Sequence, residues 1–179
     1  MHSITSIFVA LWSCLSIALA YDLSYFPPAD TVAPANVTLT KLLLQGAANI
    51  TKAPTNKNNY NLDITACNGP NDWAVTIDDG PSQYTPGVLK ALADRGLKVT
   101  FFVIGSNVLK NPQILIDAQK AGHTLAIHTW SHPFLTTLST DEIVAEIIWT
   151  ARIIREVAGV TPTIIRPPCM FSGMYIDLA

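Results

Sequence analysis

Short apolar runs alternate with longer segments of mixed polarity from about residue 71 onward. Each run has the length and the β-branched or aromatic content of a strand. The second run is almost entirely apolar, which is typical of a strand buried on both faces of a parallel sheet. The four predicted strands cover residues 73–77, 99–104, 124–127 and 163–165.

The segments between these runs carry apolar residues at three- and four-residue spacing, which predicts helices. Thr85-Pro86 and Asn111-Pro112 each place a capping residue before a proline, as at a helix start, with Thr85 and Asn111 as the N-caps. Ser139 and Glu142 form a predicted capping box for the longest helix, which Gly159 ends. The resulting order of strand, helix and strand predicts an α/β fold with a parallel sheet or barrel.

The first twenty residues predict a signal peptide. They are mostly apolar and end in Ala-Leu-Ala, so we expect cleavage before Tyr21. A buried helix or a membrane anchor is the alternative, but an apolar run of about 17 residues is short for a membrane span. We therefore expect a secreted protein, free outside the cell or held in a cell wall, without a span in the mature chain.

Residues 21–60 are rich in Pro, Ala, Asn and Thr and predict an extended lead-in. Asn36 and Asn49 each begin an N-x-Thr sequon, so we expect glycosylation at both in a secretory pathway. Residues 61–179 form the predicted domain.

The composition excludes several classes of protein. Hydrophobic residues make up 49% of the 179 residues and charged residues 13%, which does not fit a disordered chain. The net charge is −2 and no run of Lys or Arg occurs, so no nucleic-acid partner is expected. A neutral partner such as a glycan fits better, and we expect a monomer.

The cysteines leave three possibilities open. Cys14 lies in the predicted signal peptide, so the mature chain keeps Cys67 and Cys169. In an oxidising compartment these two residues can pair with each other, pair with another chain, or stay free.

Polar side chains follow the predicted strands where each one ends. Asp78 and Asp79 follow the first strand, His128 and His132 the third, and Arg166 the fourth. Parallel α/β folds gather such strand ends at one edge, and their active sites lie there. These five residues are therefore candidates for one site.

Two imidazoles four residues apart can bind one metal ion if the intervening segment turns, although surface or capping histidines have the same spacing. Asp79 would supply a third ligand and give a His2-carboxylate site suited to Zn²⁺ or a similar ion such as Co²⁺. Asp78 would remain free to accept a proton, and Arg166 could hold it in place. The alternative for Asp79 is that it only shapes a turn, and the alternative for Arg166 is an ordinary salt bridge or a surface charge.

Three segments of the chain resemble the motifs of the polysaccharide deacetylases, carbohydrate esterase family four. Residues 76–81 (TIDDGP) resemble the first motif, residues 128–132 (HTWSH) the second, and residues 166–168 (RPP) the start of the third. The similarity covers roughly residues 60–168, and residues 66–73 with the leader look most like fungal chitin deacetylases.

The resemblance implies hydrolysis of N-acetyl groups on N-acetylglucosamine residues of chitin, giving chitosan and acetate. By the motifs, Asp78 is the catalytic base, Asp79, His128 and His132 are the metal ligands, and Arg166 orients the base. The resemblance also implies substrate contacts at Trp130, Pro168 and Cys169.

The chain departs from the family pattern in two places. Cys169 stands where the third motif has Tyr or Phe, so an aromatic wall is lost. The fourth motif and the fifth, which carries the general-acid histidine, are not found before Ala179, and His123 is expected to be structural.

A (β/α)8 barrel takes about 250 residues, so we expect a partial, distorted (β/α) barrel that lacks its C-terminal strands. Two other functions stay open: a truncated, non-catalytic secreted remnant that binds metal or glycan, and a xylan O-deacetylase.

Overall fold

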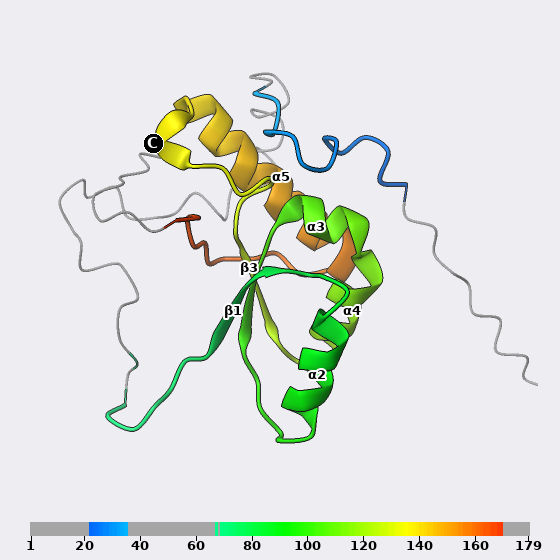
Figure 1. Ribbon diagram of the computed structural model, residues 1–179, viewed down its shortest axis with the longest axis vertical. Coiled ribbons are helices and arrows are strands. Elements are labelled where there is room, and N and C mark those ends of the chain that lie inside the picture. Colours follow the sequence, from blue (N-terminus) through cyan, green and yellow to red (C-terminus); the bar gives the residue numbers. More distant parts are fainter. Residues whose placement is uncertain (1–21, 36–66, 68, 170–179) are drawn as a thin grey trace, which may run out of the picture.

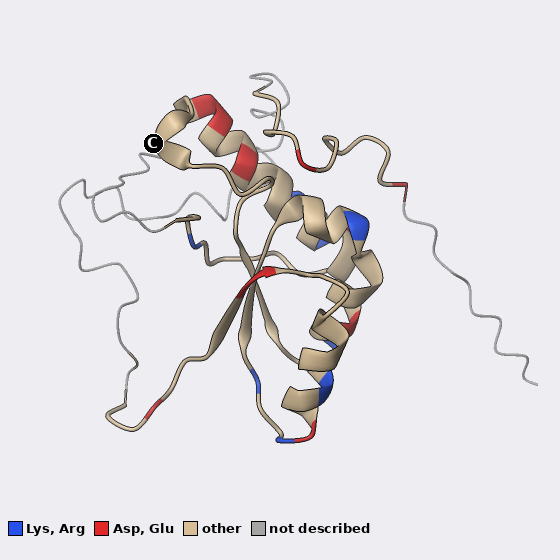
Figure 2. Ribbon diagram, viewed as in Figure 1, with Lys and Arg blue, Asp and Glu red and all other residues tan. Residues whose placement is uncertain are grey.

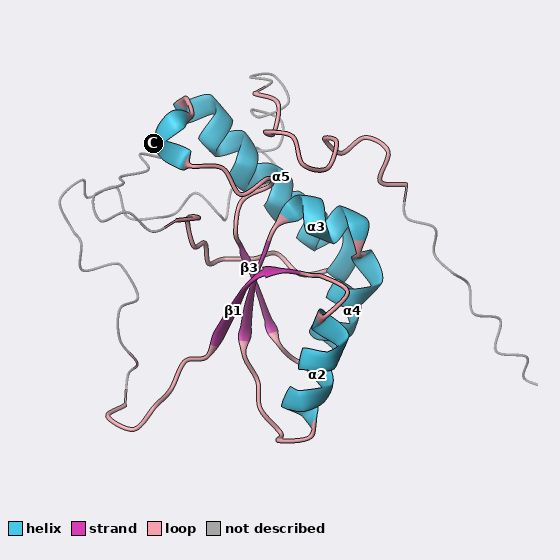
Figure 3. Cartoon of the chain, viewed as in Figure 1, coloured by secondary structure: helices cyan, strands magenta, loops and turns pink. Residues whose placement is uncertain are grey.

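Three parallel strands in the order β1-β2-β3 form the central sheet (Figure 3). The computed structural model describes residues 22–35, 67 and 69–169. The strands are β1 (Thr76–Gly80), β2 (Thr100–Val103) and β3 (Thr124–Ile127). The predicted fourth strand forms a single parallel bridge, between Ile165 and Ile127. The predicted α/β class is confirmed, and the sheet is consistent with a partial barrel.

Helices cover one face of the sheet, and Figure 1 shows α2, α3 and α4 on the same side of the strands. Phe101 and Val103 of β2 are buried in the core beneath these helices. Phe102 points to the other face and is buried as well, as expected for a strand covered on both sides. The helices are α2 (Thr85–Ala93), α3 (Gly105–Lys110), α4 (Pro112–Lys120) and α5 (Thr140–Ala158), with a 3-10 turn η2 (Leu135–Thr137).

Two predicted starts differ from the structure. β1 begins three residues later than expected, because Thr76 pairs with Thr100, the first residue of β2, and the chain before it has no strand beside it. Trp73 is consequently 91% exposed. The N-cap of α2 is Tyr84 and not Thr85, whose hydroxyl instead accepts a hydrogen bond from the Ser82 N–H in the preceding turn.

The helix α3 was not predicted, because its six residues are too few to show a periodic pattern. It ends at Lys110, and its C-cap Asn111 is also the N-cap of α4, as predicted. The Asn111 side chain, however, does not cap α4. Its amide donates backward to the carbonyl oxygens of Asn107 and Pro81.

The capping box at the start of α5 is confirmed. The Ser139 hydroxyl accepts from the Glu142 N–H, and the Glu142 carboxylate accepts from the Ser139 N–H at 2.8 Å. Gly159 ends the helix in the left-handed conformation with φ 73°, as predicted for a C-terminal glycine.

The described part of the lead-in, residues 22–35, packs against α5. Phe26 is 6% exposed and stacks on Trp130, with Trp149 edge-on to its ring. The Arg152 guanidinium lies 4.7 Å from the centre of the Tyr25 ring. This segment is therefore part of the core, and not only an extended leader.

Several predictions lie outside the described residues: the signal peptide over residues 1–20, the sequons at Asn36 and Asn49, and the segment after Cys169. Among the residues that are described, no helix is long and apolar enough to cross a membrane.

Replacing Gly105 with Ala should destabilise the fold, because the new Cβ would overlap the Trp130 ring and lie 2.9 Å from the Thr150 hydroxyl. Such overpacking typically costs about 1–3 kcal/mol of unfolding free energy. Gly87→Ala in α2 is the matched control: its Cβ would meet nothing within 4 Å, and stability should rise by about 0.5–1 kcal/mol. Denaturant unfolding measures both, and equal stability of Gly105→Ala and the wild type would contradict this packing.

Candidate active site

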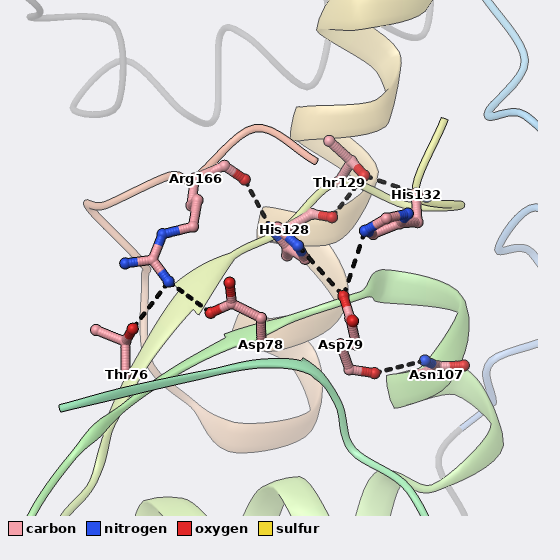
Figure 4. Close-up of polar contacts among 8 residues, drawn as sticks. All are labelled: Thr76, Asp78, Asp79, Asn107, His128, Thr129, His132 and Arg166. Carbon is pink, nitrogen blue, oxygen red and sulfur yellow. Dashed lines mark hydrogen bonds and ion pairs between the residues drawn. The ribbon is translucent and has the colours of Figure 1, made fainter. Parts of the chain in front are cut away.

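The five predicted site residues meet at the carboxyl end of the sheet (Figure 4). Asp78 and Asp79 belong to the end of β1, His128 follows β3, and Arg166 follows the bridge at Ile165. Figure 2 shows acidic residues at this end of β1, while Lys and Arg are scattered over helices and loops. The rule that parallel strands deliver their ends to one edge therefore holds here.

A bulge in β1 lets two neighbouring carboxylates serve different partners. Adjacent residues of a regular strand point to opposite faces, but the pairing with β2 shifts between Asp78 and Gly80. Asp79 sits in the left-handed region with φ 67°, and the Asn107 amide of α3 donates to its carbonyl oxygen at 2.8 Å. Figure 4 shows Asp78 directed toward Arg166 and Asp79 toward the histidines.

The two histidines converge on one oxygen of Asp79. The Nε2 atoms of His128 and His132 each lie 3.3 Å from Asp79 Oδ1. His128 is only 4% exposed, and its Nδ1 lies 2.8 Å from the backbone oxygen of Arg166. When Nδ1 carries the proton it donates to that oxygen, and the lone pair of Nε2 then faces Asp79.

The loop between the histidines has an uncommon backbone. Thr129 has φ 68° and His132 has φ 59°, both in the left-handed region. The Thr129 hydroxyl accepts a hydrogen bond from the His132 N–H at 3.2 Å, which closes the turn. Non-glycine residues held in this region are typical of functional sites, where the surrounding structure maintains the strain.

This donor set fits a divalent metal ion. Donor atoms of Asp79, His128 and His132 lie within 4.8 Å of one another, and within the described ranges no other group of three such residues does so. Two imidazole nitrogens and one carboxylate oxygen with open positions suit Zn²⁺ and similar ions. The Asp79 side chain is 65% exposed, so this side of the site is open to solvent.

Asp78 is held by Arg166 and not by the histidines. Arg166 Nη1 donates to Asp78 Oδ1 at 2.6 Å and to the Thr76 hydroxyl at 2.9 Å. Its guanidinium carbon lies over the Phe102 ring, 4.1 Å from the ring centre, and this cation–π contact helps to hold the arginine in place. Among the described residues, Asp78 Oδ2 has no hydrogen-bond partner, whereas Oδ1 is bonded to Arg166.

The prediction that Trp130 contacts substrate is wrong. Its side chain is 0% exposed and stacks on Phe26, and its indole N–H donates to the Pro28 carbonyl. The turn between the histidines directs this residue inward, into the core. Pro168 is also fully buried, so its side chain does not offer the surface that the predicted substrate contact requires. Cys169 is exposed, and both it and Cys67 are free thiols.

His123 lies away from the site, as predicted for a structural residue. Its Nδ1 accepts from the Val99 N–H, and its ring packs edge-on against Phe101. Burial of the ring, and secondarily the positive charge of Lys98, lower the pKa of His123. The neutral form is therefore favoured there.

Three residues of this region were not predicted: Thr76, Asn107 and Glu146. Thr76 and Asn107 give no sequence signal beyond their position. Glu146 does give one, because it shares a face of α5 with Thr150, Ile153 and Val157, all of which are buried.

Comparison with known proteins agrees with this geometry. The profile of the polysaccharide deacetylase family matches residues 65–172, which is more than half of the chain. The chain belongs to the polysaccharide deacetylase family. The family consists of hydrolases, and the resemblance seen in the three motifs is confirmed.

The names of two similar proteins in this family refer to different glycans. Chitin deacetylase 1 of Cryptococcus neoformans var. grubii is 49% identical over 106 residues, covering 59% of this chain and 23% of that protein. The peptidoglycan-N-acetylglucosamine deacetylase PgdA of Listeria monocytogenes is 44% identical over 96 residues, covering 53% of this chain and 21% of that protein.

Among solved structures, the Xyl-CE4 domain of a multidomain xylanase from the hindgut metagenome of Trinervitermes trinervoides is 40% identical. Its TM-score is 0.52, with 53% of this chain and 47% of that chain covered. This chain thus spans less than a quarter of the length of these two relatives and about half of this solved domain.

Replacing His128 with Ala should abolish metal retention, because it removes the most buried of the three donors. Zinc content after dialysis, measured by elemental analysis, should fall from about one ion per chain to background. His123→Gln is the control and should keep its zinc. Zinc retained at the wild-type level by His128→Ala would remove that residue from the ligand set.

Proposed function

We propose that this chain provides the metal-binding and base-carrying part of a zinc-dependent chitin deacetylase. The reaction hydrolyses the N-acetyl groups of N-acetylglucosamine residues, so that the amide C–N bond breaks and acetate and a free amine are formed. One observation carries the proposal. A carboxylate that is free of the three-donor cluster is fixed beside it by Arg166.

The residues assigned to the ion are Asp79, His128 and His132. A divalent ion held there would supply Lewis-acid polarisation of the acetamide carbonyl and a more acidic water. The backbone hydrogen bond of His128 Nδ1 keeps the other ring nitrogen free for this purpose.

Asp78 is the proposed general base. Its Oδ1 is occupied by Arg166, so the attacking water would give its proton to Oδ2. Arg166 in turn is held by Thr76 and by the Phe102 ring, which restricts how the carboxylate can rotate. A base that is held in one orientation needs little reorganisation when the proton moves. For Cys169, which is exposed, we keep the proposed contact with substrate.

The proposed substrate unit is N-acetylglucosamine. Both relatives named above are deacetylases whose names refer to chitin or to peptidoglycan N-acetylglucosamine, and the chitin deacetylase is the more similar of the two. An insoluble cell-wall polymer would be met outside the cell, in agreement with the signal peptide predicted over residues 1–20. We therefore propose a secreted enzyme.

Xylan O-deacetylation is the second candidate, because the Xyl-CE4 domain belongs to a xylanase and has a similar fold. The two candidates differ in the bond that is broken, an amide in chitin and an ester in acetylated xylan. Acetate released from acetylated xylan alone would favour the second candidate and contradict the first.

Replacing Asp78 with Asn should lower turnover on chitin oligomers by about 10²–10⁴-fold, the usual contribution of a general base. Zinc content should stay at the wild-type level, because Asp78 is not a proposed ligand. Released acetate and elemental analysis measure the two effects.

The matched control is Asp94→Asn, at an exposed aspartate that pairs with Lys90 on α2, and it should leave turnover unchanged. Unchanged turnover in Asp78→Asn would remove this residue from the mechanism. Absence of acetate release by the wild type from every substrate tested would contradict the proposed activity.

A further inference from the structure

A buried carboxylate lies directly behind the metal-binding loop. Glu146 of α5 is 0% exposed, and among the described residues it forms no ion pair with Lys, Arg or His. An isolated charge in a protein interior is costly unless hydrogen bonds replace the water that it loses. A leucine at this position would leave the backbone N–H groups that face it without an acceptor.

Four hydrogen bonds satisfy the Glu146 carboxylate. Its Oε2 accepts from the backbone N–H groups of Trp130 and Ser131, at 2.7 and 2.8 Å. Its Oε1 accepts from the Ser131 hydroxyl at 2.9 Å and from the Ala33 N–H at 2.7 Å. An ionised carboxyl is a pure acceptor, so it matches a set of four donors that no neutral side chain would satisfy.

Three of these donors belong to the residues between the two histidine ligands. The carbonyl groups of the same loop are held from another side, because the Gly105 and Ser106 N–H groups at the start of α3 donate to Thr129 and Trp130. The N–H groups of the loop are thus bonded to α5, and its carbonyl groups are bonded to α3. These contacts offset the strain of the left-handed backbone at Thr129 and His132.

We propose that Glu146 is a positioning residue of the metal site. Its carboxylate holds the Trp130–Ser131 backbone so that the Nε2 atoms of His128 and His132 both face Asp79. Glu146 touches neither the ion nor the substrate, and it acts through the loop. The proposal rests on the proposed function only in requiring that the three donors bind a divalent ion.

The N-terminal segment 22–35 completes this arrangement. Ala33, which is buried, supplies the fourth hydrogen bond to Glu146, and Phe26 stacks on Trp130 from outside the loop. Lys110 of α3 pairs with Asp30 of the same segment. The segment therefore contacts each of the parts that fix the loop.

The test is the affinity for Zn²⁺ alone, measured by titration calorimetry on the full chain without substrate. Glu146→Gln keeps the size of the side chain but turns an amide N–H₂ group toward one pair of donors. Zinc affinity should fall by about tenfold or more, as for other residues that orient metal ligands indirectly. The visible spectrum of the Co²⁺-loaded variant should also change, because it reports ligand geometry.

The matched control is Glu156→Gln on the same helix, where the carboxylate accepts from Arg152 Nε at 2.7 Å, away from the loop. It should leave both zinc affinity and the Co²⁺ spectrum unchanged. If Glu146→Gln folds and binds zinc like the wild type, Glu146 is only structural and the proposal is overturned, whatever happens to the melting temperature.

Ser131→Ala provides a second variant in case Glu146→Gln does not fold. It removes only the hydroxyl bond to Oε1, and zinc affinity should fall by about threefold, the size of one net hydrogen bond. Unchanged affinity would overturn the proposal. A wild type that does not bind zinc would overturn the proposed metal site as well, whereas a normal wild type with unaffected variants would overturn only the role of Glu146.

Discussion

Two neighbouring carboxylates must serve different partners, and the rest of the site depends on how the backbone allows this. If both Asp78 and Asp79 turned toward the histidines, their charges would repel one another. The bulge in β1 and the left-handed backbone at Asp79 separate them, so that one meets Arg166 and the other meets two imidazoles. The proposed ligand and the proposed base thereby come from consecutive positions in the chain.

The surrounding fold maintains this strained arrangement. Asn107 holds the backbone of Asp79, and the first residues of α3 hold the carbonyl groups of the histidine loop. Glu146 of α5 accepts from the N–H groups of that loop, and Gly105 leaves room for Trp130 beneath it. The short helix α3 and the long helix α5 thus both bond the backbone of the histidine loop. Packing of the core is thereby linked to the positions of the imidazole and carboxylate groups in the site.

Much of the site could be predicted from the sequence because it follows a topological rule. The ends of parallel strands meet, so polar residues after each apolar run were expected to converge, and Asp78, His128 and Arg166 do so. The capping box at Ser139 was equally clear, since it depends only on local hydrogen bonds.

The predictions that the structure corrects depend on tertiary contacts, which leave no periodic pattern in the sequence. Trp130 lies between His128 and His132, and only the turn of the loop decides that it faces the core. The start of β1 depends on where its partner strand begins, and the role of residues 22–35 depends on an aromatic contact across about a hundred positions of the chain.

The most direct test of the central claim is anomalous diffraction at the zinc absorption edge from crystals of the zinc-loaded chain. The account predicts one peak about 2.0–2.2 Å from Asp79 and from the Nε2 atoms of both histidines, with Asp78 unligated and still bonded to Arg166. A peak coordinated by Asp78, or zinc bound elsewhere with this cluster empty, would contradict it.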